Sequence, residues 1–468
     1  MHTSEIVSAL SQILGESGVI VDPARMGPYL KEPRRLFFAP ALAVALPGDV
    51  GTVQRLAAWA NENGVPLIPQ GGNTGLVGAQ VPVSGNELIV SLARLDAIRS
   101  VDAAAGHMTV EAGMILENVQ KAAEAAGMIF PLWLGSQGSA QMGGLLGSNA
   151  GGIQVLSYGN ARELCLGIEA VLADGRLFSG LSSLRKDNTG YDLKDLFIGA
   201  EGTLGIITAA TLKLFPKPEG HETALCNVAS PEEAVALLGA LRARVGERLT
   251  VFELIPRFVI EMLVRHGLVA RDPTASLSPW YVLTEVNRMR GGIAGALQAG
   301  LEEALSDGLI ADAVIAESEA DRMVMLGARE SINEAQVREG ASIKHDISVP
   351  IAAIPAMIAR GTAAVERLIP DVRPCVFGHI GDGNLHFNFA QPPEMQRDAF
   401  MALSEPVHDA IYAIVLELGG SVSAEHGIGQ LKVDLLRRVK DPVALDLMRS
   451  VKQALDPRGI LNPGKMLV

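Results

Sequence analysis

The stretch QGGNTGLVG, residues 70–78, follows directly on the apolar segment VPLIP at residues 65–69. Upstream, the pattern predicts a strand at residues 43–46, a helix at residues 50–63 that Gly64 ends, and a second strand at residues 65–69. The glycine-rich loop offers consecutive backbone N–H groups without bulky side chains, and Asn73 and Thr74 add donors. Its spacing matches neither the dinucleotide nor the P-loop pattern, so alone it predicts a tight turn or a pyrophosphate loop equally well.

Two further glycine-rich segments favour the cofactor over the simple turn. Residues 134–152 read LGSQGSAQMGGLLGSNAGG, with Ser136, Ser139, Ser148 and Asn149 as hydrogen-bonding groups. Residues 199–207 read GAEGTLGII and lead into a strand-like segment at residues 211–215. Small residues at such density permit close backbone approach to another molecule. Three such loops predict a large, flat, phosphate-bearing cofactor.

Composition limits the remaining possibilities. The chain has 468 residues, more than one hydrophobic core usually supports, which predicts two or more domains. Aromatic residues make up 4% and the net charge is −13, which argues against nucleic acid and anionic membranes as partners. No apolar run reaches the roughly 18 residues of a membrane span. Cys165, Cys226 and Cys375 form no metal-binding or disulfide pattern. We expect a cytoplasmic protein whose first helix starts near Ser4.

A second polar motif, GHIGDGNLHFN at residues 378–388, resembles part of a metal site. If Asp382 and Gly383 form a two-residue hairpin turn, His379 lies directly opposite His386, with Cβ atoms roughly 4.5 to 5.5 Å apart. Glu425 could then supply a third, anionic ligand and leave one position open, as in catalytic zinc sites. These ligands suit zinc, manganese, iron or cobalt, with zinc the first expectation. Alternatively, the two histidines only cap a polar hairpin.

Seven motifs occur in the order found in FAD-linked 2-hydroxyacid dehydrogenases of the vanillyl-alcohol oxidase type. They are the three glycine-rich segments, YGNARELCLGIEAVLADG, GHIGDGNLHFN, AEHGIGQLK and DPRGILNPGKML, and they span about residues 35–468. The resemblance is greatest to the D-2-hydroxyglutarate dehydrogenases. It implies an α+β fold with an FAD-binding domain (1–216), an α+β substrate or cap domain (217–420) and a helical C-terminal segment (421–468) that returns to the flavin.

The resemblance also implies which residues bind FAD. They are Gly71, Gly72, Asn73, Thr74 and Gly75 around the pyrophosphate, Gly135, Ser136, Ser139, Gly143, Gly144 and Asn149 along the rest of the cofactor, Glu201, Gly202 and Ile207 in the third loop, and Asn462 beside the isoalloxazine. Relatives with covalent FAD often carry a histidine in the first loop. This chain has Asn73 and Thr74 there, so we expect dissociable FAD. A homodimer is a further family-level expectation.

The chemistry implied is hydride transfer from the α-carbon of a 2-hydroxy acid to the flavin. A divalent ion on His379, His386 and Glu425 would bind the substrate hydroxyl and lower its pKa. His426 would then take the proton, unless it only orients Glu425. Asn388 is assigned to the substrate carboxylate. The electron acceptor could be an electron-transfer flavoprotein, a quinone or a cytochrome.

Substrate choice rests on ARESINEAQVREGASIKHDISVP, residues 328–350. In 2-hydroxyglutarate enzymes of the family, an Arg, a Thr and a Lys at this spacing grip the distal carboxylate, and the matching residues are Arg329, Asn333 and Lys344. The amide of Asn333 still donates, but the change admits D-malate beside D-2-hydroxyglutarate. Lys344 has an alternative reading as a solvated residue on a strand edge.

Three rival functions stay open at this point. A metal-dependent hydrolase could use the same two histidines and Glu425, although the glycine loops argue against it. A flavin-carrying electron-transfer subunit would contain the loops without oxidising a hydroxy acid. D-lactate and glycolate dehydrogenases share most of the motifs and form the runner-up.

Overall fold

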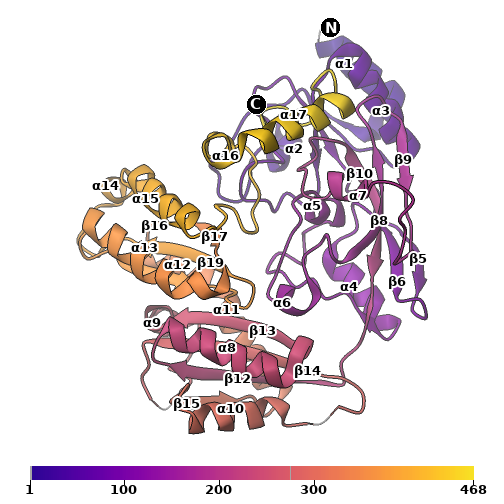
Figure 1. Ribbon diagram of the computed structural model, residues 1–468. Helices are drawn as coiled ribbons and strands as arrows, with labels where there is room; N and C mark the ends of the chain where they lie inside the picture. The colour runs from indigo at the N-terminus through magenta and orange to yellow at the C-terminus, as the bar shows by residue number, and fades with distance from the viewer. Residues whose placement is uncertain (1–2, 275, 293, 468) are drawn as a thin grey trace. The chain divides into compact units, whose positions relative to one another are not determined.

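A computed structural model of the protein describes residues 3–274, 276–292 and 294–467 (Figure 1). The chain divides into two compact units. The first contains residues 1–152, 159–217 and 425–468, and the second contains residues 153–158 and 218–424. The sequence predicts boundaries after residues 216 and 420, whereas these divisions follow residues 217 and 424. The short segment 153–158, within the predicted FAD-binding domain, belongs to the second unit.

The first unit begins with a small mixed sheet that carries the first glycine loop at one strand end. Its order is β1 (Val19–Ile20), β2 (Ala43–Ala45), β4 (Leu88–Ser91) and β3 (Leu67–Gln70), of which the last three run parallel. Helix α3 (Val50–Asn63) connects β2 to β3. It packs with α1 (Thr3–Leu14) into the apolar core. Asp49 caps α3 by accepting from the Thr52 N–H at 2.8 Å, and Gly64 ends it at φ 65°.

An antiparallel five-stranded sheet completes the first half of this unit. Its order is β5 (Ile98–Asp102), β6 (His107–Glu111), β10 (Ile206–Lys213), β8 (Cys165–Val171) and β9 (Leu177–Gly180). Helix α5 (Met142–Gly147) contacts β10 and contains part of the second glycine loop. Further elements of this part are α2 (Pro23–Met26), α4 (Leu116–Ala125), α7 (Lys194–Phe197) and the pair β7 (Met128–Ile129) and β11 (Phe215–Pro216).

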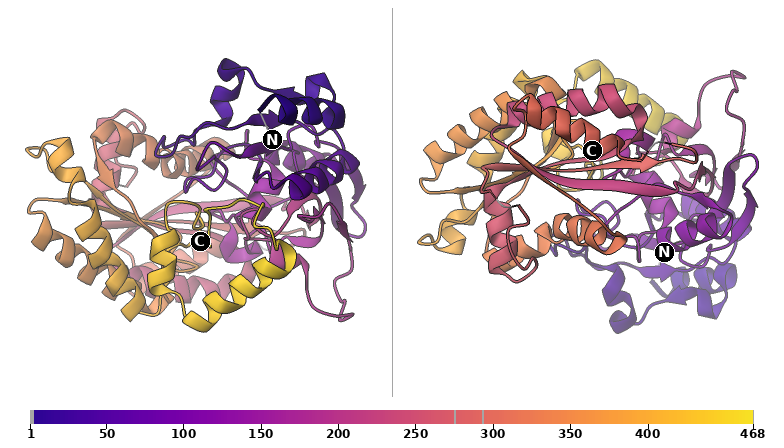
Figure 2. Two further views of the ribbon diagram at one scale, coloured as in Figure 1. Left: turned by 90° about the horizontal axis from the view of Figure 1, so that it is seen from above. Right: turned by 90° about the horizontal axis from the view of Figure 1, so that it is seen from below.

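The second unit contains an antiparallel sheet with helices on both sides (Figure 2, right). Its order is β13 (Leu249–Pro256), β14 (Trp280–Arg288), β12 (Gly220–Val228) and β15 (Asp312–Ile315). One buried cluster joins it to α9 (Arg257–Arg265), α11 (Glu319–Glu330) and α12 (Ile332–Glu339). Helices α8 (Pro231–Val245) and α10 (Ala296–Ser306) pack together on the sheet. Segment 153–158 contains α6 (Val155–Tyr158).

A second sheet of this unit has one apolar face and one mixed face, on which the polar side chains lie beside the buried Cys375 and Phe377. Strand β19 (Asn384–Ala390) pairs with β16 (Ser342–Ile343), β17 (Asp346–Ser348) and β18 (Arg373–Phe377), all antiparallel. Helices α13 (Ile354–Leu368) and α15 (Ser404–Glu417) pack together, and Gly361 of α13 brings that helix against the Phe387 ring. Because alternate strand residues point to opposite faces, Asn384, His386 and Asn388 lie on the face away from Phe387.

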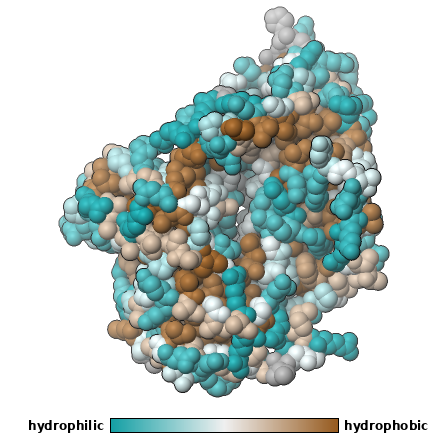
Figure 3. All heavy atoms as spheres, viewed as in Figure 1, coloured by the Kyte–Doolittle hydropathy of each residue, from teal (hydrophilic) through white to brown (hydrophobic). Residues whose placement is uncertain are grey.

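The C-terminal segment of the first unit contains α16 (Val433–Val439) and α17 (Pro442–Leu455), and Leu461 forms a bridge with Leu67 of β3. Apolar atoms gather over α17 on the face shown in Figure 3, where Val443 and Leu447 are exposed. The α+β fold predicted from the sequence is therefore confirmed, as is the helix predicted at residues 50–63.

One helical stretch within the described residues, Arg397–Glu417, has the length and composition of a membrane span. It includes α14 (Arg397–Met401) and α15. Its side chains Val407, Ile411 and Val415 are buried against the rest of the unit. A single stretch of this kind is weak evidence for a membrane span, because core helices pass the same test.

Candidate active site

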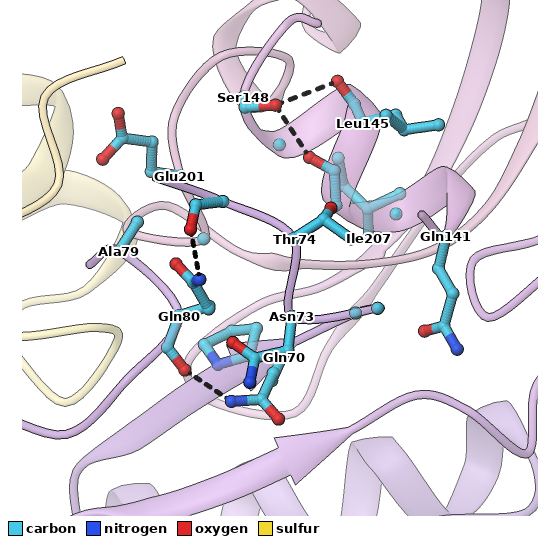
Figure 4. Close-up of a pocket in the computed structure, with 18 of the residues that line it drawn as sticks. Gln70, Asn73, Thr74, Ala79, Gln80, Gln141, Leu145, Ser148, Glu201 and Ile207 are labelled. Carbon is cyan, nitrogen blue, oxygen red and sulfur yellow. Dashed lines mark hydrogen bonds between the residues drawn. The ribbon is translucent and has the colours of Figure 1, made fainter. Parts of the chain in front are cut away.

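The three predicted glycine loops line one cavity in the first unit, which encloses about 940 Å³ of empty space including its mouth (Figure 4). Predicted FAD residues that line it are Gly71, Gly72, Asn73, Thr74, Gly75, Gly143, Gly144, Glu201, Gly202 and Ile207. His426, the predicted base, lines the same cavity.

The glycines of this cavity serve two different purposes. A Cβ at Gly72 would lie 1.9 Å from the Ser139 carbonyl oxygen, so the first two loops touch through their backbones. By contrast, a Cβ at Gly147 would meet no atom within 4 Å, and one at Gly144 would reach only the Gly71 Cα at 4.0 Å. Packing within the protein therefore does not require glycine at positions 144 and 147. A molecule in the cavity would require it.

Buried oxygen atoms around the cavity also fit a cofactor. The side-chain oxygens of Gln70, Asn73 and Gln141 are buried without a hydrogen-bond partner. The amide of Gln70 donates to Gln80 O at 2.8 Å, and Gln80 Nε2 donates to Gly75 O at 2.8 Å, so the loop is held open (Figure 4). Unpaired buried acceptors are costly, and a ligand with hydroxyl and N–H donors would satisfy them. FAD carries both kinds of donor.

Five predicted FAD residues do not line this cavity, and several of them support its walls instead. Asn149, at φ 53°, accepts from the Arg162 N–H at 2.9 Å. Asn462 donates to Ala79 O at 3.0 Å and to Glu201 O at 2.6 Å, which ties the C-terminus to two lining residues. The remaining three are Gly135, Ser136 and Ser139, all in the second loop.

A valine at Gly144 is expected to weaken FAD binding by about 5- to 150-fold, since forcing atoms into filled space costs about 1 to 3 kcal/mol. Backbone strain is not expected because Gly144 lies within α5. Fluorescence titration of apoprotein with FAD gives the dissociation constant. Gly239→Val in α8, where a Cβ also meets nothing within 4 Å, is the control. Equal affinity in the two variants would contradict this placement of FAD.

The side chain of Glu201 holds the segment that carries His426. Its two carboxylate oxygens accept from the N–H groups of Ile428 at 2.6 Å and Gly429 at 2.7 Å. A Cβ at Gly427 would lie 2.2 Å from Glu201 Oε1, so only glycine fits there at φ 81°. Burial raises the pKa of Glu201, although these N–H groups and Lys465 oppose the shift. His426 is thereby fixed on the cavity wall.

Three predicted residues of the second unit, Lys344, His386 and Asn388, share one face of its second sheet, and His379 lies beside it. Lys344 lies at the register position opposite Asn388, because Ile343 pairs with Phe389 and Asp346 with His386. The Asn388 side-chain oxygen accepts from the His345 N–H at 3.1 Å, and its amide nitrogen donates one hydrogen to Gln336 Oε1 at 3.4 Å, so one N–H is left for a ligand. The His379 and His386 rings are 5.7 Å apart between centroids. This face therefore combines a cation, an amide and an imidazole, and the second imidazole lies next to it.

The hairpin predicted from Asp382 and Gly383 is wrong. Phe377, not His379, lies opposite His386, and residues 378–383 form a six-residue connection between β18 and β19. The physical reason is a long-range contact. Gly378 exchanges two backbone hydrogen bonds with Leu254 of β13, at 2.9 and 3.1 Å, so the chain leaves β19 before the predicted turn. His379 moves to β13 as a result.

This displacement places His379 beside Glu253, which is fully buried on β13. His379 Nδ1 and Arg329 Nε bond to different oxygens of the Glu253 carboxylate, and Arg329 also lies 3.3 Å from His379 Nε2. Burial opposes ionisation of Glu253, but Arg329 and His379 outweigh it and hold the pKa at about 2. Arg329 is therefore already neutralised by a carboxylate, which removes the argument that repulsion between Arg329 and Lys344 requires a bridging ligand.

Asn333, Glu425 and His426 lie outside the sheets of the second unit. Asn333 is exposed in the first turn of α12, whereas Arg329 ends α11 and is buried, so the helix break at Ser331 separates the two. Glu425 and His426 begin the C-terminal segment of the first unit.

Sequence reasoning missed Glu253 and Asp346, both buried acids on strands. Asp346 lies directly opposite His386 and accepts from Asn384 Nδ2 at 3.0 Å. The alternation of side chains along a strand could have indicated Asp346. In KHDIS, residues 344–348, positions 344, 346 and 348 share one face, so Asp346 is expected on the same face as Lys344.

Family models match both parts of the chain. The FAD binding domain matches residues 41–180, and the C-terminal domain of FAD linked oxidases matches residues 217–466, more than half of the chain. The chain belongs to the FAD-linked oxidases. It is an FAD-dependent oxidoreductase, and the family predicted from the seven motifs is confirmed.

Relatives and solved structures agree with this assignment. A D-2-hydroxyglutarate dehydrogenase of Xanthomonas citri pv. viticola is 37% identical over 99% of this chain and 97% of its own length. The mitochondrial D-2-hydroxyglutarate dehydrogenase of Bos taurus is 39% identical over 96% and 81%. The structure of p-cresol methylhydroxylase with substrate bound covers 99% of this chain and 96% of its own, with a TM-score of 0.77 at 16% identity. That likeness confirms the vanillyl-alcohol oxidase type of fold.

Proposed function

We propose that this oxidoreductase converts D-2-hydroxyglutarate to the 2-oxo acid. The observation that carries the proposal is the position of Lys344 directly opposite Asn388, on the sheet face that also carries His386. Lys344 is the only lysine among residues 218–424. A cation and an amide donor side by side suit a carboxylate remote from the reacting carbon. Relatives named D-2-hydroxyglutarate dehydrogenase across the whole chain support the same substrate.

In this proposal each side chain has one task. FAD, when bound, supplies the hydride acceptor that no side chain can provide. His426 lies on the cavity wall in the segment that the Glu201 carboxylate binds, and it takes the proton of the substrate hydroxyl. Asn388 donates to a substrate carboxylate, and Lys344 pairs with the distal one.

We further propose that His379, His386 and Glu425 hold a divalent metal, with zinc the first candidate. The two imidazoles lie together in the second unit. Glu425 directly follows Ala424, whose N–H donates at 3.3 Å to the backbone oxygen of Asp346, the residue opposite His386. Two histidines and a carboxylate leave a coordination position for the substrate hydroxyl, whose pKa such an ion would lower.

Anaerobic mixing with a panel of hydroxy acids tests the reaction. D-2-Hydroxyglutarate should bleach the flavin absorbance faster than D-malate, D-lactate, glycolate or the L-enantiomers. Faster bleaching by D-lactate or glycolate would overturn the substrate. No bleaching by any hydroxy acid would overturn the dehydrogenase and favour an electron-transfer subunit.

Lys344→Ala is expected to lower kcat/KM for D-2-hydroxyglutarate by about 10- to 150-fold, because it removes a charge-assisted contact worth roughly 1.5 to 3 kcal/mol. D-Lactate has no distal carboxylate, so its kcat/KM should barely change. Steady-state assays with both substrates measure the ratio, and exposed Lys186→Ala is the control. Equal losses of kcat/KM on both substrates would mean that Lys344 stabilises the fold or binds the carboxylate next to the reacting carbon.

A further inference from the structure

Glu253 joins His379, a proposed metal ligand, to Arg329. It is fully buried near the end of β13, and its two oxygens bond to His379 Nδ1 and Arg329 Nε. Arg329 reaches it from α11, which packs on the same sheet (Figure 1). His379 reaches it because Gly378 bridges to Leu254, the next residue on β13. One carboxylate on β13 therefore holds two side chains, one from α11 and one from the connection at residues 378–383.

The contacts of His379 decide which of its nitrogens can face a metal. A guanidinium only donates, so the contact of Arg329 with Nε2 places the lone pair of His379 on Nε2 and its proton on Nδ1, toward Glu253 Oε1. Carboxylates in this position orient ligating histidines and make them more basic. The bridge at Gly378 fixes the backbone, and Glu253 fixes the ring.

The same contact balances charge. Arg329 Nη2 donates to His379 Nε2 at 3.3 Å, and its guanidinium stacks 5.0 Å from the Phe377 ring centroid. A metal on Nε2 would take the place of this donor and would leave the guanidinium beside it. An uncompensated guanidinium there would repel a divalent cation. Glu253 neutralises it without occupying Nε2.

A second buried pair in the same sheet lacks the link to a proposed ligand. Glu285 of β14 is fully buried, and Arg322 of α11 bonds to both of its oxygens at 2.7 and 3.0 Å. His221 Nδ1 lies 3.5 Å from it. Arg322 and Arg329 are seven residues apart on one helix. Glu285 therefore matches Glu253 in burial, in its arginine partner and in its neighbouring histidine, while His221 is not among the proposed metal ligands.

We propose that Glu253 is a positioning residue for the metal site, which sets the Nε2 of His379 toward the ion and neutralises Arg329 beside it. This inference rests on the proposed function, because His379 must be a metal ligand. It assigns to Glu253 no contact with the substrate or the flavin.

The test compares zinc affinity in wild-type protein, Glu253→Gln and Glu285→Gln, all with FAD bound. A glutamine has a single acceptor oxygen, so Glu253→Gln loses one of the two contacts and the charge. Competition with a chromophoric chelator should show zinc binding about 10- to 100-fold weaker in Glu253→Gln. Glu285→Gln should keep wild-type affinity, although both variants lose a buried charge. Flavin content should be unchanged in both.

Cobalt provides a second readout, since its ligand-field bands at wavelengths beyond the flavin absorption report ligand geometry. These bands should change in Glu253→Gln and not in Glu285→Gln. If Glu253→Gln does not fold, Glu253→Asp takes its place, with the charge kept and zinc binding still weakened because the shorter side chain withdraws from His379.

The outcomes separate the two hypotheses. Wild-type affinity in Glu253→Gln, or equal losses in both variants, would overturn the positioning role and leave the metal site standing. Wild-type protein that binds no zinc and no cobalt would overturn the metal site itself, and the positioning role with it.

Discussion

Replacing His426 with alanine is expected to slow flavin reduction by D-2-hydroxyglutarate by about 10²- to 10⁴-fold, the usual contribution of a positioned base. His426 lines the glycine-rich cavity in which FAD is expected. The variant should fold, because Glu201 holds this segment through the backbone N–H groups of Ile428 and Gly429, not through the imidazole. Anaerobic stopped-flow absorbance measures the chemical step directly.

The control is His107→Ala, which removes a histidine of the same unit that is absent from the cavity lining. FAD content should be equal in both variants, so a slower reduction cannot come from lost cofactor. If His426→Ala reduces its flavin at the wild-type rate, His426 is not the base, and its role is limited to orienting Glu425.

Elements that are specified by residues close to them in the sequence were predictable. Helix α3 has the predicted bounds because Asp49 caps its first turn and Gly64 ends it in the left-handed conformation. The cavity-lining glycines were predictable for a similar reason, since close approach of the backbone to another molecule favours glycine at each such position. These signals lie within a few residues of the feature that they specify.

Features that depend on distant strands were not predictable. Asp382-Gly383 is a good local hairpin signal, yet the pairing of Gly378 with Leu254 outweighs it. Glu253 precedes its partner His379 by 126 positions, and nothing in LTVFELIP marks its carboxylate as paired. The opposition of Lys344 and Asn388 depends on the register of β19, which the sequence leaves open.

Removing the metal is expected to abolish turnover while FAD stays bound. The glycines that line the cofactor cavity belong to the first unit, and His379 and His386 belong to the second. Chelation should therefore leave the flavin absorbance of the desalted protein unchanged and reduce hydroxy acid oxidation to background. Zinc, added back after the chelator is removed, should restore activity.

Glu425→Ala should reproduce the effect of chelation without a chelator, because it removes the only proposed anionic ligand. Glu417→Ala, which removes an exposed carboxylate of the second unit, is the matched control and should keep full activity. Full activity in metal-free protein or in Glu425→Ala would contradict the metal role. The histidine pair would then be part of the scaffold, and activation of the substrate hydroxyl would depend on His426 without help from an ion.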